Sequence, residues 1–482
     1  MSSNILFLLS VSEPFFTRCM DLFELDSRRR KCRLSAFSYY NYSDHDLSVF
    51  DHVVYFKDVL DQMNDKAHAI DFMVESRRME AEYQFVLSDL IHAERHFARF
   101  NKEDAFRVAV LMGLKVEELN KENKVSLIVA EGLDDFLSMF AYFFSRRYEI
   151  PFRYPVRSRI GTGVYLSDGL DGNVAACRPS NGNATLNADE YIDNYLEKKE
   201  QPSYMVANKR FFKVADRRDF LVLAKKTIQK NKDTTFHAYE GSIDILKKRV
   251  FRIVNALNYS AVLKNNRVAL KDIVERGVDF FVYPLHFHPE ASTLVKGRWI
   301  NNQLQIIEFI SKSLPSNYVL LVKEHRVSIG RRRRDFYREI VKHHNVMLVN
   351  HDLNPHDLIR HSTGVVTISS SMGLEAILHN KPVICFGDVF YNRLPGVENA
   401  RDFTRMQDYV NNAIGFKGYD KAHVSQMVSD ILKYSVFPET DFSPHHFTDE
   451  HCSALLDLLD GDLDHLVHNH EHRYTFHQGE AS

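Results

Sequence analysis

The fold is decided by the segment Thr367-Ile-Ser-Ser-Ser-Met-Gly-Leu-Glu-Ala-Ile-Leu-His-Asn-Lys-Pro-Val-Ile-Cys-Phe-Gly387. It joins an apolar run to a Ser/Gly turn, a helical stretch and a second apolar run, which is the order of elements in a parallel sheet. A helix that begins at the carboxyl end of a strand offers N–H groups and its positive dipole end to an anion. Ser370 and Ser371 suit the cap of this helix, and Gly373 admits a ligand or a neighbouring backbone. The segment indicates a phosphate-binding turn or, more simply, a serine-capped core helix.

The same alternation of strands and helices extends on both sides of this segment. We expect strands at 279–287, 318–323, 346–349, 364–368 and 382–386, and helices at 300–313, 335–343, 355–361, 371–379, 404–414 and 420–434. The strands are short and apolar throughout, as parallel strands buried on both faces are. Right-handed crossovers place a ligand at the carboxyl ends of such strands. Residues 278–435 are therefore predicted to form a nucleotide-binding Rossmann-like domain.

The first half of the chain indicates a second α/β domain. Expected strands lie at 4–9, 53–56, 124–130 and 150–154, with helical spacing over 69–121 and 135–147. We expect a Rossmann-like domain over 1–270 that includes a basic helical extension at 188–265. Two Rossmann-like domains facing each other across a cleft are the predicted architecture. The tail, 440–482, is acidic and rich in histidine, and partial disorder is expected there.

Composition excludes several classes of function. The net charge of −2 argues against a nucleic-acid partner. The five cysteines are scattered, which predicts neither a zinc site nor a disulfide framework and favours a reducing cytoplasm. The first apolar run, Ile5–Leu9, is only five residues long, so we expect neither a signal peptide nor a membrane span. The chain contains none of the glycine motifs of P-loop proteins or classical dehydrogenases, and no nucleophile elbow.

Polar side chains that follow two predicted strands are candidates for chemistry. His286, His288 and Glu290 follow the strand at 279–287, and alternation puts the two histidines on one side while the strand persists. Carboxylate and imidazole groups at this position suit acid/base work, although a polar loop explains them equally. Lys323 and His325 follow the strand at 318–323 and are expected to neutralise a phosphate.

Other polar groups carry weaker expectations. Glu375 lies one helical turn into the segment quoted above, where it can reach ribose hydroxyls or simply favour the helix N-terminus. Glu13, Glu131 and Arg159 follow strands of the first domain and are assigned to the acceptor side of the cleft. The run Arg331–Arg334 is read as a solvated basic loop.

Four motifs together resemble the bacterial capsule polysaccharide biosynthesis family, which includes retaining β-Kdo transferases that use CMP-Kdo. They are Tyr283-Pro-Leu-His-Phe-His-Pro-Glu290, Val322-Lys-Glu-His325, Ile368-Ser-Ser-Ser-Met-Gly-Leu-Glu-Ala376 and Lys381-Pro-Val-Ile-Cys-Phe-Gly-Asp-Val-Phe-Tyr391. The resemblance covers about 278–391, with a weaker match over 124–168. It implies a GT-B-like fold whose C-terminal domain binds the donor.

The resemblance also implies roles for single residues. Lys323 and His325 match the motif near the donor phosphate, and Ser370, Ser371, Gly373 and Glu375 match the serine–glycine turn and the acid after it. Glu290 falls where relatives carry an essential carboxylate. Two positions depart from the family pattern. Arg326 replaces a proline, and histidines stand where a Gln/Asp pair is usual.

Three hypotheses follow. The first is a cytoplasmic glycosyltransferase, peripheral to the inner membrane or part of an assembly complex, that transfers a sugar from a nucleotide donor to a capsule or lipopolysaccharide glycan without a metal or cofactor. Glu290, with His286 and His288, would carry the chemistry, as a nucleophile if configuration is retained and as a base if it is inverted. The second is a sugar-nucleotide epimerase, which needs no acceptor. The third is a non-catalytic polysaccharide-assembly protein.

Overall fold

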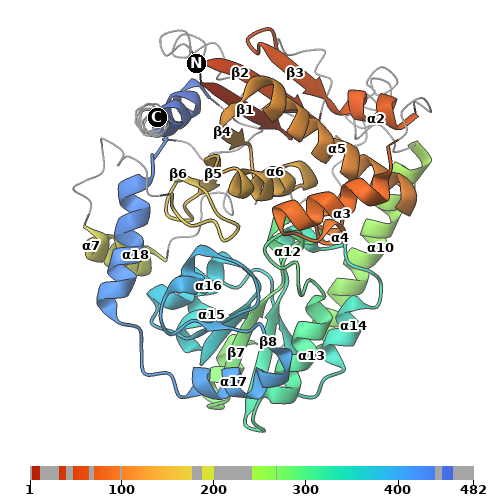
Figure 1. The fold of residues 1–482 in the computed structure, drawn as a ribbon. Coiled ribbons are helices and arrows are strands. Elements are labelled where there is room, and N and C mark those ends of the chain that lie inside the picture. The colour runs from red at the N-terminus through yellow and green to blue at the C-terminus, as the bar shows by residue number, and fades with distance from the viewer. Residues whose placement is uncertain are drawn as a thin grey trace. The chain divides into compact units, whose positions relative to one another are not determined.

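The chain divides into two compact α/β units. The computed structural model describes residues 3–10, 32–39, 47–64, 70–97, 100–175, 187–199, 242–266, 269–439 and 448–459. The first unit comprises 1–186 and 429–482, and the second comprises 187–428 (Figure 1). This division lies elsewhere than the boundary near 270 that the sequence suggested. The chain enters the second unit at 187 and returns to the first after 428.

The first unit is built on a six-stranded sheet in the order β3-β2-β1-β4-β5-β6. Its strands are β1 (Asn4–Leu9), β2 (Arg33–Ser38), β3 (His52–Tyr55), β4 (Val125–Ala130), β5 (Phe152–Arg157) and β6 (Val164–Ser167). All neighbours pair in parallel except β6, which runs antiparallel to β5. The first five strands have the Rossmann order, in which the chain switches direction across the sheet between β1 and β4. The sequence analysis did not predict β2 or β6.

Helices cover this sheet. They are α2 (Phe56–Asn64), α3 (Phe72–Tyr83), α4 (Leu87–Ala93), α5 (Lys102–Asn123) and α6 (Phe136–Arg147). Three of them, α3, α5 and α6, begin at a side-chain cap. The side chain of Asn101 accepts the N–H of Asp104 at the start of α5, and Asp135 accepts that of Ser138 at the start of α6. Such caps satisfy N–H groups that lack a partner within the helix.

The end of the described chain completes the core of the first unit. Val436 forms an antiparallel bridge with Val164 of β6. Residues 449–459 are helical, and Leu455 lies in the same buried cluster as Ile5 and Phe7 of β1. This helix belongs to the tail that the sequence analysis set apart. The remainder of 440–482 lies outside the described residues.

The second unit has a fully parallel sheet in the order β12-β11-β10-β7-β8-β9. Its strands are β7 (Asp279–Pro284), β8 (Tyr318–Lys323), β9 (Val346–Val349), β10 (Gly364–Thr367), β11 (Val383–Cys385) and β12 (Glu398–Asn399). Counted from β7, this is again the Rossmann order, and the switch lies between β7 and β10. The predicted α/β class with two Rossmann-like sheets is confirmed. The strand predicted to reach 287 ends at Pro284, so strand alternation does not extend to the two histidines beyond it.

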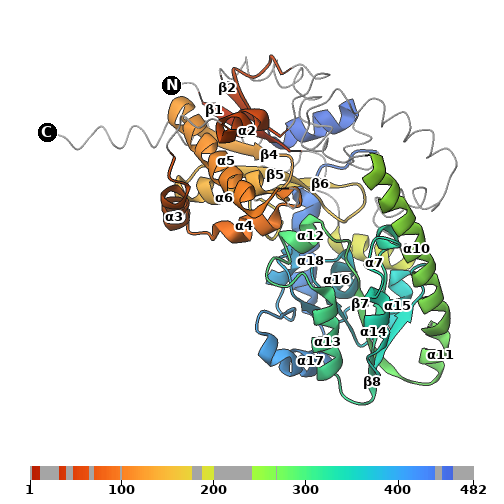
Figure 2. The ribbon, with the colours of Figure 1, turned by 90° about the vertical axis from the view of Figure 1, so that its right-hand side faces the viewer.

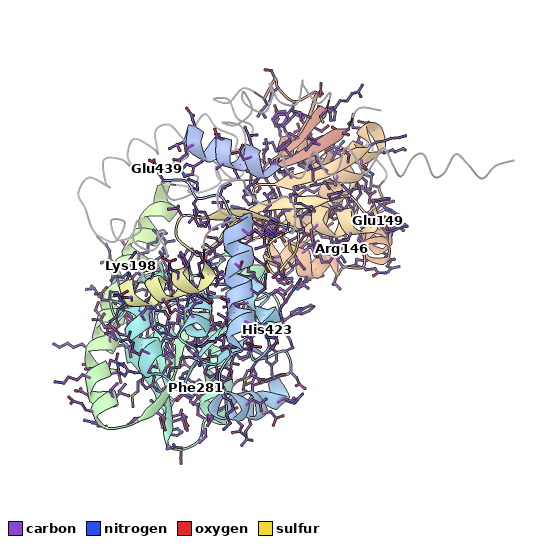
Figure 3. All side chains as sticks on the ribbon, turned by 90° about the vertical axis from the view of Figure 1, so that its left-hand side faces the viewer. Arg146, Glu149, Lys198, Phe281, His423 and Glu439 are labelled. Carbon is purple, nitrogen blue, oxygen red and sulfur yellow. The ribbon has the colours of Figure 1, made fainter. Side chains whose placement is uncertain are left out.

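Helices cover both faces of the second sheet. The core on one face contains residues of α10 (Ser242–Asn266), α13 (Gln303–Ser313), α14 (Phe336–Val341) and α17 (Met406–Ile414) (Figures 1 and 2). α15 (Pro355–His361) and α16 (Ser371–Leu378) pack together, and α16 lies against β10 and β11. α7 (Ala188–Lys198), which ends at Lys198 in Figure 3, crosses α18 (Lys421–Tyr434), where Ser425 donates to Asp189.

The helical extension predicted at 188–265 is described at its two ends only. Both ends, α7 and α10, belong to the second unit, although the sequence assigned the extension to the first. Helical periodicity does not show which of two sheets a helix packs on. Residues 200–241 lie outside the described part of the chain. Among the residues that the structure describes, no helix has both the length and the apolar character needed to cross a bilayer.

The returning helix gives a testable prediction for the first unit. Leu455→Ala should lower its free energy of unfolding by roughly 2–5 kcal/mol, because a buried leucine is replaced by a cavity. Amide hydrogen exchange should accelerate in β1 and β4 and stay unchanged in β7 and β8. Ser453→Ala, on the exposed side of the same helix, is the matched control. Equal exchange in the two variants would contradict the placement of this helix.

Candidate functional site

Polar side chains converge at the carboxyl ends of β7 and β10 in the second unit. These two strands flank the switch point of the sheet, where open α/β sheets bind their ligands. The turn after β7 carries His286, His288 and Glu290, and the turn after β10 carries the serines that precede α16. Both turns were candidates from the sequence, and the fold brings them together.

His286 joins the two turns. Its imidazole is buried, and Nε2 accepts the backbone N–H of Ser369 at 3.1 Å. A backbone N–H only donates, so Nε2 carries no proton. Gln303 at the start of α13 holds the backbone of His286, since its Oε1 accepts the His286 N–H at 2.7 Å and its Nε2 donates to the His286 carbonyl at 3.0 Å. His286 thus fixes the serine turn through Nε2.

The serine turn uses several of its own N–H groups inside the protein. Besides Ser369, Ser370 donates its N–H to Oγ1 of Thr367 at 2.9 Å, and Met372 donates to Oγ of Ser370 at 3.2 Å. Gly373 donates to the Ser370 carbonyl at 3.1 Å. The sequence predicted N–H groups open to an anion. What this turn provides is mainly the dipole of α16 and the serine hydroxyls.

The space that Gly373 leaves free is occupied by a side chain, whereas the sequence suggested that a ligand or a neighbouring backbone would approach there. A Cβ placed on Gly373 would lie 2.2 Å from the hydroxyl of Tyr391. That hydroxyl donates to the Ser370 carbonyl at 2.8 Å. The missing Cβ of Gly373 therefore leaves space for the Tyr391 hydroxyl, which forms a hydrogen bond to the serine turn.

Lys323 and His325 lie at the carboxyl end of β8, next to β7. Nζ of Lys323 donates to the carbonyl of His351 at 2.8 Å. Burial lowers the pKa of Lys323 to about 8, and nearby Arg326 adds to this, so the amine is largely protonated at neutral pH. Burial lowers the pKa of His325 to about 4, so this imidazole is neutral near pH 7. His325 is therefore a neutral group in a site where the sequence suggested a second cation.

Three further candidates differ in exposure. Glu375 is only 2 % exposed, and its charge acts on Lys323, where it raises the pKa. His288 and Glu290 are exposed at the start of α12 (Ala291–Leu294), whose N-cap is Glu290. Ser292 donates its hydroxyl to Oε2 of Glu290 at 3.2 Å. Partial desolvation by neighbouring groups lowers the pKa of His288, and the charge of Arg332 lowers it further. The imidazole therefore stays neutral more readily and is available as a proton acceptor.

The structure adds two residues that the sequence analysis did not single out. Arg332, read as part of a solvated basic loop, is buried; its Nη2 donates to the His286 carbonyl at 2.6 Å and lies 3.1 Å from Oε1 of Glu324. Glu324 is buried between the two predicted phosphate ligands and accepts the N–H of His325 at 2.6 Å. The only sequence signal was the position of Glu324 inside the Lys-Glu-His motif.

The acceptor-side candidates belong to the first unit. Glu131 follows β4, and its Oε2 accepts the N–H of Ser10, which follows β1, at 2.8 Å. Arg159 lies in the β5–β6 turn with a φ of 61°. Glu13 lies outside the described residues.

The sequence analysis missed a buried pair of carboxyl groups near Glu131. Glu94 accepts the hydroxyl of Tyr39 at 3.2 Å and the N–H of Phe136 at 3.0 Å. Asp135, at the N-cap of α6, is buried beside it. Burial raises the pKa of both carboxyl groups, and each feels the charge of a neighbouring aspartate. Glu94 was missed because nothing in its local sequence marks it as buried.

A match to a family model covers most of the second unit. Residues 183–413 match the model described as capsule polysaccharide biosynthesis protein, a range that contains the whole candidate site of the second unit. This region, just under half of the chain, matches the capsule polysaccharide biosynthesis family. The resemblance inferred from the four motifs is thereby confirmed.

Curated relatives of this chain match over part of their length. The capsule polysaccharide modification protein LipB of Neisseria meningitidis serogroup A is 24% identical over 182 residues, which are 36% of this chain and 42% of LipB. The capsule polysaccharide export protein KpsS of Escherichia coli is 32% identical over 92 residues, 18% of this chain and 24% of KpsS. The chain therefore matches less than half the length of these two relatives.

Solved structures resemble this chain more distantly. The β-Kdo 2,7 transferase KpsC of Thermosulfurimonas dismutans has a TM-score of 0.33 and 13% identity, covering 72% of this chain and 89% of that one. The UDP-GlcNAc 2-epimerase of Methanocaldococcus jannaschii has a TM-score of 0.26 and 10% identity, covering 89% and 99%. Scores this low support no functional argument, and the description of the fold rests on the two strand orders.

Gly373 gives a prediction for the serine turn. Gly373→Ala should destabilise the second unit by roughly 1–3 kcal/mol, because the added methyl group displaces Tyr391. Urea unfolding of the purified variant measures this. Gly415→Ala is the control, since a Cβ there would lie 3.4 Å from the carbonyl oxygen of Asn411 and the φ of −80° suits alanine. Equal stability of the two variants would contradict the packing.

His325 gives a prediction about pH. The unfolded chain binds a proton at His325 near pH 6.5, whereas the folded protein does so only near pH 4, so stability falls as the pH drops between these values. His325→Gln should flatten the loss of unfolding free energy between pH 6.5 and 4. The exposed His423→Gln is the control for the substitution itself. Identical slopes for wild type and His325→Gln would show that the imidazole protonates freely in the folded state.

Proposed function

We propose that this chain is a glycosyltransferase that moves a sugar from a nucleotide donor, CMP-Kdo or another sugar nucleotide, to a growing capsule or lipopolysaccharide glycan. One observation carries the proposal: a lysine, a buried carboxylate and a serine-capped helix converge at the switch point of a Rossmann-order sheet. The match of residues 183–413 to the capsule polysaccharide biosynthesis family supports a carbohydrate substrate. Relatives named for capsule modification and export point in the same direction.

The donor would bind through its phosphate and ribose. The amine of Lys323, held by the His351 carbonyl, supplies a positive charge, and the dipole of α16 adds to it. Ser370 and Ser371 offer hydroxyl groups at the start of that helix, and Glu375 faces the lysine as the candidate partner of the ribose. Fixed positive groups of this kind stabilise a leaving phosphate without a metal ion or cofactor.

The reacting sugar would lie near the turn after β7. Glu290 is exposed there, as a nucleophile or a base must be, and its N-cap position fixes its backbone. As a nucleophile it would form a glycosyl-enzyme and retain configuration, and as a base it would invert configuration. The exposed His288 can accept a proton from the hydroxyl of the acceptor.

The acceptor would be a glycan or glycolipid. Glu131 and Arg159 of the first unit remain the candidates for its recognition, and peripheral association with the inner membrane or an assembly complex would bring such an acceptor within reach.

A ligand screen tests donor binding directly. The protein is heated with CMP-, UDP-, GDP- and dTDP-sugars, because a ligand that binds only the folded state raises its stability. At a hundredfold excess over Kd, one of them should raise the Tm by about 5–10 °C. Lys323→Met should abolish the shift. Conversion of a sugar nucleotide without any acceptor would identify an epimerase instead, and no shift with any of them would favour a non-catalytic role.

Substitution of Glu290 tests the chemical step. Glu290→Gln should lower transfer at least about 100-fold, because an amide is neither a nucleophile nor a base here, while the thermal shift by the donor survives. Glu275→Gln, on the exposed helix α11 (Leu270–Glu275), is the matched control and should transfer normally. Normal transfer by Glu290→Gln would remove this residue from the mechanism.

A further inference from the structure

A buried ion pair links the two polar turns of the candidate site. Arg332 and Glu324 are 8% and 1% exposed, and Nε and Nη2 of the arginine lie 3.2 Å and 3.1 Å from the two carboxylate oxygens. Arg332 Nη2 also donates to the carbonyl of His286, at the end of β7. Glu324 accepts the N–H of His325, at the end of β8. The pair therefore contacts the backbone of both turns.

The hydrogen bonds of the pair extend into the surrounding core. The hydroxyl of Tyr337 in α14 donates to Oε2 of Glu324 at 2.7 Å. The side chain of Asn255 in α10 donates to the carbonyl of Arg332 at 2.7 Å. Tyr259, one turn further along α10, contacts the ring of Tyr337 and hydrogen-bonds Nδ1 of His351 at 3.0 Å. His351 in turn holds Lys323.

A buried ion pair contributes little net stability to a core. Desolvation of two charges cancels most of their attraction, so apolar residues of the same volume often stabilise a protein as well or better. What apolar residues do not provide is direction: a guanidinium and a carboxylate fix the atoms around them through oriented hydrogen bonds. Here the oriented groups are the His286 carbonyl and the His325 N–H.

We propose that Arg332 and Glu324, without touching the substrate, are positioning residues that hold the turn after β7 in register with the turn after β8. The inference rests on the proposed function, because it assigns the reacting sugar to one turn and the donor phosphate to the other. The ion pair then sets the distance between the group that reacts and the group that binds phosphate. A shift of about 1 Å between such groups costs on the order of 100-fold in rate.

Arg332→Lys tests the geometric part without any ligand. Lysine keeps the charge and loses the fork that reaches Glu324 and the His286 carbonyl together. We expect amide hydrogen exchange to accelerate at least about tenfold in residues 285–294 and to stay unchanged in α15 and β11. Unchanged exchange in 285–294, or equal acceleration across the whole second unit, would overturn the proposal.

Glu324→Gln tests the coupling to Lys323, again without a ligand. Groups that act on this amine are Arg326, Glu375, Asp352 and Glu324, and the three carboxylates raise its pKa against the effect of burial. Removing one of them should move the pH midpoint of Lys323 below about 8, measured by competitive acetylation and mass spectrometry. Glu308→Gln, an exposed pair partner of Lys312, is the control. An unmoved midpoint in folded Glu324→Gln would contradict the proposal; if this variant does not fold, Arg332→Lys decides.

Kinetics separate this inference from the proposed function. With a donor identified by the ligand screen, Arg332→Lys should lower kcat by about 10- to 100-fold and change KM for the donor by less than about threefold. Loss of kcat and donor affinity together with Tm would mark a merely structural role. If the wild-type protein binds no sugar nucleotide, the proposed function fails, and the exchange and acetylation results still decide whether the pair positions the two turns.

Discussion

The imidazole of His286 bridges two strands that diverge. β7 and β10 pair only at Phe281 with Gly364 and at Val282 with Val365, and beyond these pairs the two chains separate toward their helices. The gap is a property of the Rossmann order, because the crossovers on either side of it lead in opposite directions. Nε2 of His286 spans the gap to the N–H of Ser369, 83 residues away in sequence. The serine turn, the N-terminus of α16 and the position of Glu375 depend on this contact.

The same contact occupies Nε2 of His286. A nitrogen that accepts a backbone N–H is unavailable to exchange protons with a substrate. Under the proposed function, the exposed His288 and Glu290 are therefore better placed for proton transfer than Nε2 of His286, which holds the serine turn. Two histidines separated by one residue differ in exposure, because β7 ends at Pro284 and strand alternation does not continue to them.

Sequence patterns predicted the second sheet well and the first sheet less well. β8 and β9 match the predicted ranges because strands buried on both faces are continuous apolar runs. β2 escaped notice because its sequence, Arg-Leu-Ser-Ala-Phe-Ser, places serines in the core, where Ser35 donates to Asn4 at 3.1 Å. The division into units was not predictable for a different reason. Periodicity shows that a helix has an apolar face and does not identify the sheet that covers it.

Within the candidate site, motifs revealed the positions of residues and not their pairing. Lys323 and the serines could be placed because they follow strands. Arg332 could not, since four consecutive arginines are usually solvated, and its burial depends on Glu324, eight residues earlier, being folded against it. Gly373 was recognised as necessary, but its partner, Tyr391, lies beyond the next strand.

The return of the chain to the first unit sets an order of events during synthesis on the ribosome. Every residue of the second unit is synthesised before the strand partner Val436 and the helix at 449–459. The second unit can fold as a complete domain at that stage, whereas the first still exposes the apolar surface of Ile5, Phe7 and their neighbours. The N-terminal sheet, although synthesised before the second unit, is thus the last of the two sheets to have its core completed.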